Sequence, residues 1–436
     1  MIAAMILPLL LAATPAAAAP APAHLSPAES RMVATVDAEQ ARSVALLERL
    51  VNQNSGTMNL AGVARVGAMM AEALRPLGFT VTWKPLPQTG RAGHLIATHA
   101  GTPGTKRLLL IGHLDTVFEA DSPFQRFVRR GDEASGPGAG DDKGGMVVML
   151  AALRAMQAAG TLGSANIEIV LTGDEEDSGD PVAVARADLI AAGKRADAAL
   201  DFEGLAVEDG RDMGSIARRS VNDWTLVVTG RTGHSSRIFS ADFGDGAANE
   251  LARILAAFRS ELPEANLTFN TGLLAAGASA TIAAGGDKAQ AQGKSNIIPA
   301  QAVASGDFRT LSEAQTQRVG ARMRGIVARH LPGTDAVLTI KPGYPAMAPT
   351  AGNQALLARL NAVNRDLGLA EMPPLDPLKR GAGDISWVAA DVDGLVGLGT
   401  ASRGDHTPDE VVDLESIRRQ AKRAAILMSR LSAERR

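Results

Sequence analysis

Five short segments of the sequence carry histidines and carboxylates beside apolar runs, and these residue types could do chemistry. The segments span residues 112–118, 136–145, 172–179, 201–204 and 404–410. They offer His113, Asp115, Asp141, Glu175, Glu176, Glu203 and His406. Imidazole and carboxylate groups are typical ligands of Zn²⁺ and similar ions. Such a set can hold two metal ions and leave one carboxylate free to act on water, which is the chemistry of metal-assisted hydrolysis.

The first segment, GHLDTVF, places His113 and Asp115 two residues apart at the end of an apolar run. In an extended chain both side chains then point to the same side. One can bind a metal ion while the other orients the imidazole. The alternative is a loop histidine beside a solvated aspartate, so the pair carries weight only together with the other segments.

The second segment, GPGAGDDKGG, places Asp141 and Asp142 at a glycine-rich turn into a predicted helix. Adjacent acids repel each other, and a carboxylate that bridges two metal ions would relieve this repulsion. The alternative is an ordinary N-terminal cap, a role for which aspartate is well suited.

The third segment, TGDEEDSG, has four consecutive acids after an apolar run. Most charge runs are solvated turns. The functional interpretation divides the work between neighbours: Glu176 binds metal, and Glu175 stays unligated and takes a proton from a water molecule whose pKa the metal lowers.

The last two segments add one ligand each. In DFEG, either Asp201 or Glu203 could bind metal, and both could instead be a surface pair. In GDHTPDE, Pro408 stiffens the loop that follows His406. A further histidine, His234, stands in the sequence TGHSS and lies far from these segments along the chain.

Short apolar runs that alternate with helical patterns must position these groups. Strands are predicted at 79–85, 94–98, 107–111, 167–171, 198–202 and 395–398, and helices at 27–51, 60–75, 144–159 and 181–192. This alternation predicts an α/β fold with a mainly parallel sheet. Four of the five segments follow or end such a strand, and ligands gather outside the carboxyl ends of strands in open α/β sheets. The segments are therefore expected to meet at one edge of the sheet.

The middle of the chain has a different pattern. Strands are predicted at 221–229, 267–272, 300–309 and 336–340, with helices at 246–258 and 312–330. The order β-α-β-β-α-β is ferredoxin-like, and residues 275–294 carry no assignment. We therefore predict an inserted α+β domain at 218–343, between two parts of a catalytic domain at 28–217 and 344–436.

The composition excludes several classes of function. The net charge is -3 and aromatic residues make up 3% of the chain, which argues against nucleic-acid partners. The chain has no cysteine, so thiolate metal sites and disulfides are excluded.

The N-terminus predicts export. The first 28 residues contain no charged side chain, and an apolar run at 2–13 precedes small residues at 16–19. This pattern is typical of a signal peptide, here residues 1–19, and implies a periplasmic or secreted protein with no membrane contact after processing. The departure is the missing basic residue before the apolar run. The alternative is a membrane anchor, for which the run is short.

Taken in order, the segments resemble the dinuclear zinc peptidase family of glutamate carboxypeptidases, aminoacylases and succinyl-diaminopimelate desuccinylases. The resemblance extends from about residue 41 to the C-terminus. It is strongest to the bacterial glutamate carboxypeptidases, through GPG-x-x-DDKGG, the DEE run, SNIIPA at 295–300 and G-x-G-D at 381–384.

The resemblance implies a role for each metal-site residue. Two Zn²⁺ ions, or other divalent ions, would be held by His113, Asp141, Glu176, Glu203 and His406. Asp141 would bridge the ions and be joined to Asp142 by a cis peptide bond, while Asp115 would support His113. Glu175 would be the general base, and Asp201 is the alternative ligand to Glu203.

The resemblance also implies that the inserted domain forms a homodimer and acts as a lid. His234 would polarise the scissile carbonyl, often from the partner subunit, and Asn296 and Arg309 would hold the substrate carboxylate. Arg211 is a further candidate for carboxylate binding, and Gly383 stands where the carboxypeptidases have a hydroxyl residue. Residues 214–220 also differ from the carboxypeptidase pattern.

These observations predict a metal-dependent hydrolase of short peptides or N-acyl amino acids that carry a free C-terminal carboxylate. One alternative is an aminoacylase or deacylase with another substrate preference. The other is a catalytically silent carboxylate-binding protein on the same scaffold.

Overall fold

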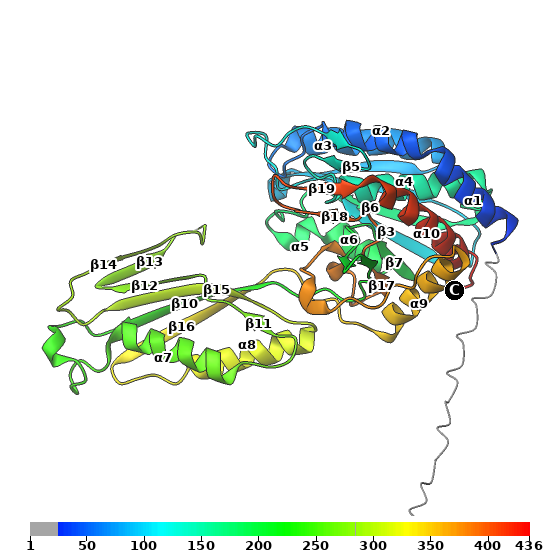
Figure 1. Ribbon diagram of the computed structural model, residues 1–436. Coiled ribbons are helices and arrows are strands. Elements are labelled where there is room, and N and C mark those ends of the chain that lie inside the picture. Colours follow the sequence, from blue (N-terminus) through cyan, green and yellow to red (C-terminus); the bar gives the residue numbers. More distant parts are fainter. Residues whose placement is uncertain (1–24, 284) are drawn as a thin grey trace, which may run out of the picture.

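The computed structural model describes residues 25–283 and 285–436, which form two units with separate sheets (Figure 1). The predicted signal peptide, residues 1–19, lies outside the described residues. In the part of the chain that is described, no helix is both long and apolar enough to cross a membrane.

The larger unit is built on a six-stranded sheet of order β1-β2-β6-β3-β7-β17. Strands β6, β3, β7 and β17 are parallel, and β1 and β2 join antiparallel at one edge. This mainly parallel sheet confirms the predicted α/β class. The bounds are β1 (Thr80–Leu86), β2 (Arg91–His99), β3 (Arg107–His113), β6 (Asn166–Thr172), β7 (Ala198–Asp201) and β17 (Gly394–Leu395).

Helices cover both faces of this sheet, which explains the unbroken apolar run in β3. Leu108 and Leu110 pack into one buried cluster, while Leu109 and Ile111 pack into another on the opposite face. Successive side chains of a strand point to opposite faces, so a strand buried on both sides must be apolar throughout.

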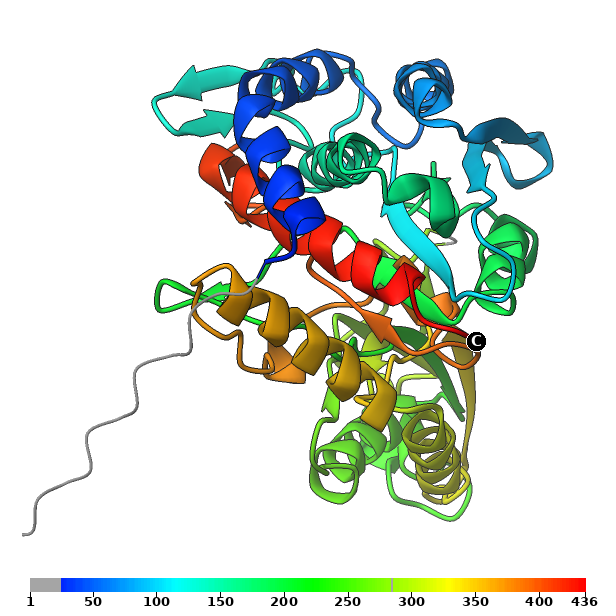
Figure 2. The same ribbon diagram turned by 90° about the vertical axis from the view of Figure 1, so that its right-hand side faces the viewer.

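Eight α-helices are described in the larger unit, and they are α1 (Pro27–Ala38), α2 (Gln40–Val51), α3 (Leu60–Leu74), α4 (Lys143–Ala158), α5 (Val182–Ala185), α6 (Ala187–Gly193), α9 (Ala351–Asp366) and α10 (Leu414–Ser432). Helices α1 and α10 lie side by side (Figure 2), and Arg430 of α10 pairs with Glu29 of α1 at 2.7 Å. The chain end therefore packs against the first helix.

Three predicted elements differ in detail. The helix predicted at 27–51 bends at Glu39, although backbone hydrogen bonds continue through the bend. The helix predicted at 181–192 is divided at Arg186, whose side chain is buried. The strand predicted at 395–398 is only two residues long, because Gly397 adopts a positive φ of 86° and turns the chain.

The smaller unit has a ferredoxin-like order, as predicted. Its sheet runs β11-β15-β10-β16, with β12 also paired to β15, and α7 and α8 pack on one face. The bounds are β10 (Asn222–Gly230), α7 (Gly246–Glu261), β11 (Thr268–Phe269), β12 (Leu273–Gly277), β15 (Gln301–Arg309), α8 (Glu313–Val327) and β16 (Thr334–Pro342).

The second strand of this unit, predicted at 267–272, is found only in part. Within that range Thr268 and Phe269 form β11, and the N–H groups of Asn270 and Gly272 still donate to carbonyls of β15 at 2.9 Å. The longer partner of β15 is Leu273–Gly277, which follows the predicted range. The carbonyl of Asn270 would lie 1.8 Å from a Cβ at position 306, so this irregular crossing needs Gly306. The unassigned segment holds the hairpin β13 (Ser279–Ile282) and β14 (Ala289–Gln292).

Candidate metal centre

A cluster of imidazoles and carboxylates lies at the carboxyl edge of the larger sheet. His113 is the last residue of β3, Asp141 precedes α4, Glu176 follows β6, and His406 lies in the loop after β18 (Ser402–Arg403). Ligand atoms of His113, Asp141 and Glu176 all lie within 4.8 Å of one another. The structure therefore brings together residues from four distant parts of the sequence.

Asp141 stands between the two histidines. Its Oδ1 is 2.9 Å from Nε2 of His113, and its Oδ2 is 3.1 Å from Nε2 of His406. The same nitrogen of His406 is 3.3 Å from a carboxylate oxygen of Glu176. A carboxylate with one oxygen toward each imidazole has the arrangement that a bridging ligand needs.

Asp115 orients both the imidazole and the acidic loop. Its Oδ1 lies 3.4 Å from Nδ1 of His113. The backbone N–H groups of Glu175 and Glu176 donate to the same carboxylate, each at 3.1 Å, and the Thr57 hydroxyl donates at 2.7 Å. A carboxylate behind a ligating histidine fixes its tautomer and ring orientation.

The glycine-rich turn before α4 is held by Glu410. This carboxylate accepts the N–H groups of Gly138, Gly140 and Asp141 at 2.8–3.2 Å. The bond between Asp141 and Asp142 is cis, as the resemblance implied. Helix α4 can come this close to the centre because residue 145 is glycine, since a Cβ there would lie 2.1 Å from Oδ1 of Asp142.

The centre buries more negative charge than its arginines and histidines balance. Burial raises the pKa of Glu176 to about 8, with the charge of Asp141 adding to the effect, and burial also raises the pKa of Asp201 to about 8. Burial likewise raises the pKa of Asp142 well above its usual range, and its Oδ1 makes no hydrogen bond within the described chain. Buried carboxylates of this density need a cation. The donors, all oxygen and imidazole nitrogen, fit a divalent metal ion.

The two histidines reflect the same imbalance. The hydrogen bond with Asp141 raises the pKa of His406 to about 9. Burial would lower the pKa of His113, but its contacts with Asp115 and Asp141 raise it well above the usual range. The carboxylates around both histidines therefore favour a positive charge at these positions.

Glu175 combines a free carboxylate with a fixed backbone. Burial raises its pKa well above the usual range, and the charges of Glu203 and Asp384 add to the effect. Its N–H donates to Asp115, and its carbonyl accepts the hydroxyl of Tyr344 at 2.7 Å. A carboxyl group with a raised pKa is suited to take and return a proton near neutral pH.

Buried Arg186 holds the acidic loop that follows β6 in place. Nη1 of Arg186 lies 2.5 Å from Oδ1 of Asp174, and its Nε lies 3.0 Å from Oδ1 of Asp384. Its Nη2 donates to Tyr344 at 2.9 Å. No local sequence pattern predicts this network, because Arg186 and its three partners come from four separate segments of the chain.

Glu203 is close to the centre but faces an arginine. Its carboxylate pairs with Arg218, and its backbone N–H donates to Asp201 at 3.1 Å. Gly383 lies against it, since a Cβ there would be 2.3 Å from Oε1 of Glu203. A hydroxyl residue at position 383 would therefore displace this carboxylate.

The residues predicted to contact substrate lie in three places. His234 and Asn296 are exposed neighbours in the smaller unit, joined by the N–H of Ser235 to the carbonyl of Asn296 at 3.0 Å. Arg309, at the end of β15, lies beside Gly381 of the larger unit. The structure does not bring Arg211 to the centre, because its exposed guanidinium donates to the carbonyl of Glu371 at 3.1 Å.

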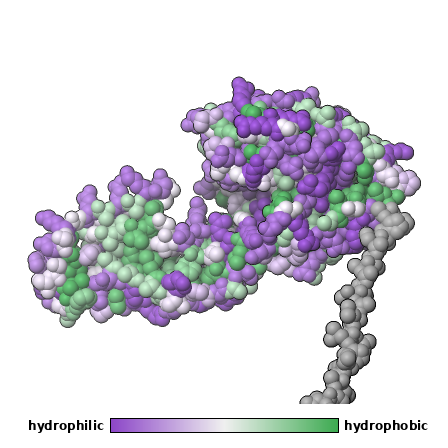
Figure 3. Space-filling model, viewed as in Figure 1, coloured by the Kyte–Doolittle hydropathy of each residue, from purple (hydrophilic) through white to green (hydrophobic). Residues whose placement is uncertain are grey.

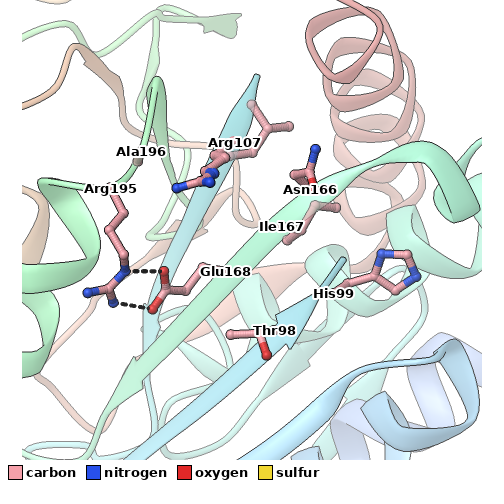
Figure 4. Close-up of a pocket in the computed structure, with 9 residues that line it drawn as sticks. Thr98, His99, Arg107, Asn166, Ile167, Glu168, Arg195 and Ala196 are labelled. Atoms are coloured by element: carbon pink, nitrogen blue, oxygen red, sulfur yellow. Dashed lines mark hydrogen bonds and ion pairs between the residues drawn. The ribbon is translucent and has the colours of Figure 1, made fainter. Parts of the chain in front are cut away.

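A separate cavity of about 180 Å³ lies at the opposite edge of the same sheet (Figure 4). Arg107 and Asn166 begin β3 and β6 there, and Glu168 pairs with Arg195 at 2.6 Å. This cavity shares no lining residue with the metal centre.

Comparison with known proteins identifies the family. The model of peptidase family M20/M25/M40 matches residues 109–430. Carboxypeptidase G2 of Pseudomonas sp. (strain RS-16) is 30% identical over 409 residues, covering 91% of this chain and 90% of that protein. Succinyl-diaminopimelate desuccinylase of Variovorax paradoxus (strain S110) is 27% identical, covering 86% and 94%. The crystal structure of aminopeptidase PepT from Bacillus cereus has the same fold, with a TM-score of 0.70, 17% identity and coverage of 90% and 98%.

Proposed function

The chain belongs to peptidase family M20/M25/M40, a family of metal-dependent hydrolases, and we propose that it cleaves an amide bond in short peptides or N-acyl amino acids with a free C-terminal carboxylate. The relative named carboxypeptidase G2, similar over almost the whole chain, supports a glutamate carboxypeptidase-like activity. The observation that carries the proposal is the carboxylate of Glu175, which lies close enough to His113 to feel its charge, while His113 and His406 share Asp141.

Two zinc ions are the proposed cofactors. His113, Asp141 and Glu203 would hold one ion, and Asp141, Glu176 and His406 the other. The close grouping of His113, Asp141 and Glu176 and the raised pKa of Glu176 support this donor set. When bound, the ions polarise the scissile carbonyl and lower the pKa of water. Other divalent ions that accept oxygen and imidazole ligands are alternatives.

Glu175 is the proposed general base. It takes a proton from the attacking water and returns this proton to the leaving amine, so it acts twice in one turnover. Asp115 keeps His113 in position, and Arg186 holds the loop behind the base. His234 would stabilise the charge that develops on the carbonyl oxygen.

Binding of the substrate carboxylate is proposed for Arg309 and Asn296. A guanidinium suits this task because it can form two parallel hydrogen bonds with a carboxylate. Gly383, also predicted as a substrate residue, is closely packed, since a Cβ there would lie 2.3 Å from Oε1 of Glu203 and 2.6 Å from Nη2 of Arg218.

A homodimer is proposed for the protein in solution. His234 is exposed on the smaller unit, where its ring nitrogen bonds to Ser236 at 2.8 Å. The family resemblance supports the proposal that another copy of the chain supplies this side chain to each centre. Val227, Leu274 and Val337 are exposed on the smaller unit, and Figure 3 shows apolar patches among hydrophilic areas on one face of this unit. A monomeric mass in solution would weaken the proposed role of His234.

We also propose that the protein is exported to the periplasm or secreted. The proposal rests on the uncharged first 28 residues and their apolar run. N-terminal sequencing of the protein expressed in bacteria tests it, since an intact Met1 on a cytosolic product would overturn export.

The activity is tested with a panel of N-acyl amino acids with acidic, neutral or basic C-terminal residues. The zinc-loaded protein is assayed with and without a chelator. Chelator-sensitive release from acidic members supports the carboxypeptidase-like proposal. Activity confined to other members favours the aminoacylase or deacylase alternative, for which the desuccinylase relative gives some support. Binding without turnover at full metal occupancy favours the silent binding protein.

A further inference from the structure

Two chain segments join the smaller unit to the larger one, and they pair with each other. The N–H of Arg218 donates to the carbonyl of Met347 at 3.0 Å, and the N–H of Met347 donates to the carbonyl of Arg218 at 2.9 Å. Residues 218–221 and 343–347 form this paired connector. Arg218 is therefore fixed by its backbone to the connection between the units.

The side chain of Arg218 extends from the connector to the metal centre. Its Nη1 pairs with Oε2 of Glu203, its Nε donates to the carbonyl of Gly381 at 2.6 Å, and its Nη2 donates to the carbonyl of Ala382. Each nitrogen of this buried guanidinium thus has an acceptor. Burial would lower the pKa of Arg218, but the charges of Glu203 and Asp201 raise it, so the guanidinium stays charged.

The arginines around Glu203 use only one of its two oxygens. Arg218 pairs with Oε2, and Nη2 of Arg380 is 3.7 Å from the same Oε2. Burial raises the pKa of Asp142 and of Glu175, and the charge of Glu203 adds to both effects, so this carboxylate lies close to the metal centre. Oε1 is therefore the oxygen that suits a metal ion.

The pair of Glu203 and Arg218 needs the glycine at position 383. A Cβ there would lie 2.3 Å from Oε1 of Glu203 and 2.6 Å from Nη2 of Arg218, so a side chain would displace one of the two partners. Residues 214–220 and Gly383 are both places at which the sequence departs from the carboxypeptidase pattern. The structure brings these two departures together at one carboxylate.

We propose that Arg218 is a positioning residue, which fixes one oxygen of Glu203 so that the other can bind a metal ion, and which links this metal site to the connector between the units. Hydrogen bonds to a ligating carboxylate orient it, and their loss weakens metal binding. Because the coupling is reciprocal, a metal ion that fixes Glu203 also stabilises the pairing of Arg218 with Met347. The inference rests on the zinc site of the proposed function, but not on turnover.

Zinc binding, measured by calorimetry, tests the positioning role. Arg218→Lys keeps the positive charge but cannot serve three acceptors at once, so a loss of affinity reports position rather than charge. It should weaken one of the two zinc ions about 10-fold or more, as losses of residues that support a metal ligand do, and leave the ion at His406 unchanged. Arg218→Gln is the second variant if Arg218→Lys fails to fold, and it should weaken the same ion.

The neighbouring Arg219 provides the matched control. Its guanidinium donates to the hydroxyl of Thr268 at 2.7 Å and to the carbonyl of Leu378 at 3.1 Å, and so serves other partners. Arg219→Lys should leave the affinity for both zinc ions unchanged.

Hydrogen exchange of backbone amides measures the link to the connector without any reaction. In the wild type, zinc should slow exchange of the N–H groups of Arg218 and Met347 in the connector, and of Gly140 in the glycine-rich turn. In Arg218→Lys the effect of zinc on the connector should be lost, while its effect on Gly140 should remain.

These measurements separate the inference from the proposed function. Wild-type zinc affinity in Arg218→Lys, or connector amides that do not respond to zinc in the wild-type protein, would overturn the inference even if amide hydrolysis is found. Zinc affinity and connector exchange that both depend on Arg218, in a protein that cleaves no amide, would support the inference and contradict the proposed activity.

Discussion

The two edges of the central sheet hold similar residues in opposite electrostatic conditions. Strand β3 begins with Arg107 at one edge and ends with His113 at the other, and β6 carries Glu168 near one edge and leads to Glu175 beyond the other. Both edges thus combine imidazole, carboxylate and guanidinium groups. Only the carboxyl edge buries carboxylates without enough cations.

At the edge where the parallel strands begin, the amino edge, Arg195 and Glu168 form an ion pair that is accessible to solvent. Arg195 donates to both oxygens of Glu168, at 2.6 and 3.1 Å, and its side chain is 50% exposed. The Asn166 amide donates to the carbonyl of Thr102 at 2.7 Å. Arg107, which also lines this cavity, is exposed, so its charge is open to solvent. Buried charges with shifted pKa values are therefore a better indication of a reactive site than the presence of a cavity.

Among the substitutions at the two edges, Glu175→Gln at the carboxyl edge is expected to have the largest effect on turnover. The substitution keeps the shape of the side chain and removes its ability to accept a proton, so turnover should fall about 1000-fold. Zinc content and the thermal unfolding temperature should stay near those of the wild type. Initial rates at full zinc occupancy provide the measurement, and near-normal turnover would refute the base assignment.

His406→Ala should act on the metal itself. Loss of this imidazole leaves Asp141 and Glu176 without their shared partner. Because the substitution removes a proposed direct ligand, zinc affinity should fall by at least about 100-fold at one site, the upper end of losses known for supporting residues. Elemental analysis after dialysis measures the bound zinc. Two full equivalents in the variant would rule out the ligand role.

Metal uptake should depend strongly on pH. The hydrogen bond with Asp141 raises the pKa of His406 to about 9, and burial raises that of Glu176 to about 8, so both groups carry a proton at pH 7 in the metal-free protein. A metal ion must displace these protons, so zinc affinity should increase with pH, about tenfold per pH unit for each proton released. Calorimetry in buffers of different ionisation enthalpy counts the protons. Affinity that stays flat from pH 6 to 8 would contradict the account.

Tyr344→Phe should have a smaller effect on the carboxyl edge. It removes one hydroxyl that donates to the carbonyl of Glu175 and accepts from Arg186. A hydrogen bond of this kind contributes about 1 kcal/mol, so kcat should fall about fivefold. KM and zinc content should not change, because the side chain touches neither the substrate residues nor the proposed ligands. Equal losses in kcat and zinc content would indicate a structural role instead.

Glu168→Gln should have the smallest effect of all. It weakens an exposed pair with Arg195, and such pairs contribute about 0–1 kcal/mol to stability. Hydrolysis by this variant should remain within about twofold of the wild type, and chemical denaturation should detect little change. A large loss of activity would mean that the amino edge takes part in the reaction.

The sequence predicted the members of the metal centre better than the groups that support them. His113, Asp141 and Glu176 each stand in a short segment at a strand end or helix start, so residue type and position made them candidates, and the family resemblance assigned their roles. Arg186 and Tyr344 could not be found in this way. Their role depends on partners from distant segments, and an arginine in a helical pattern gives no sign that it is buried.

The elements of the fold that depend on contacts between distant segments were likewise predicted less well than those set by local periodicity. Helices α3 and α4 and the strands of the parallel sheet follow from apolar periodicity, and the structure confirms them. The second strand of the smaller unit was predicted only in part, because the irregular pairing depends on the close approach of Asn270 to Gly306. Arg211 lies near a candidate segment in sequence, but in the structure its guanidinium donates to the carbonyl of Glu371, so its substrate role stays a prediction.

Anomalous diffraction at the zinc edge, from crystals soaked in zinc, tests the central claim most directly. We expect two peaks, one on each side of Asp141, and none in the cavity lined by His99 and Glu168. A single peak beside Asp141 would contradict a paired centre while keeping the metal chemistry. Zinc bound only at the amino edge would contradict the account as a whole.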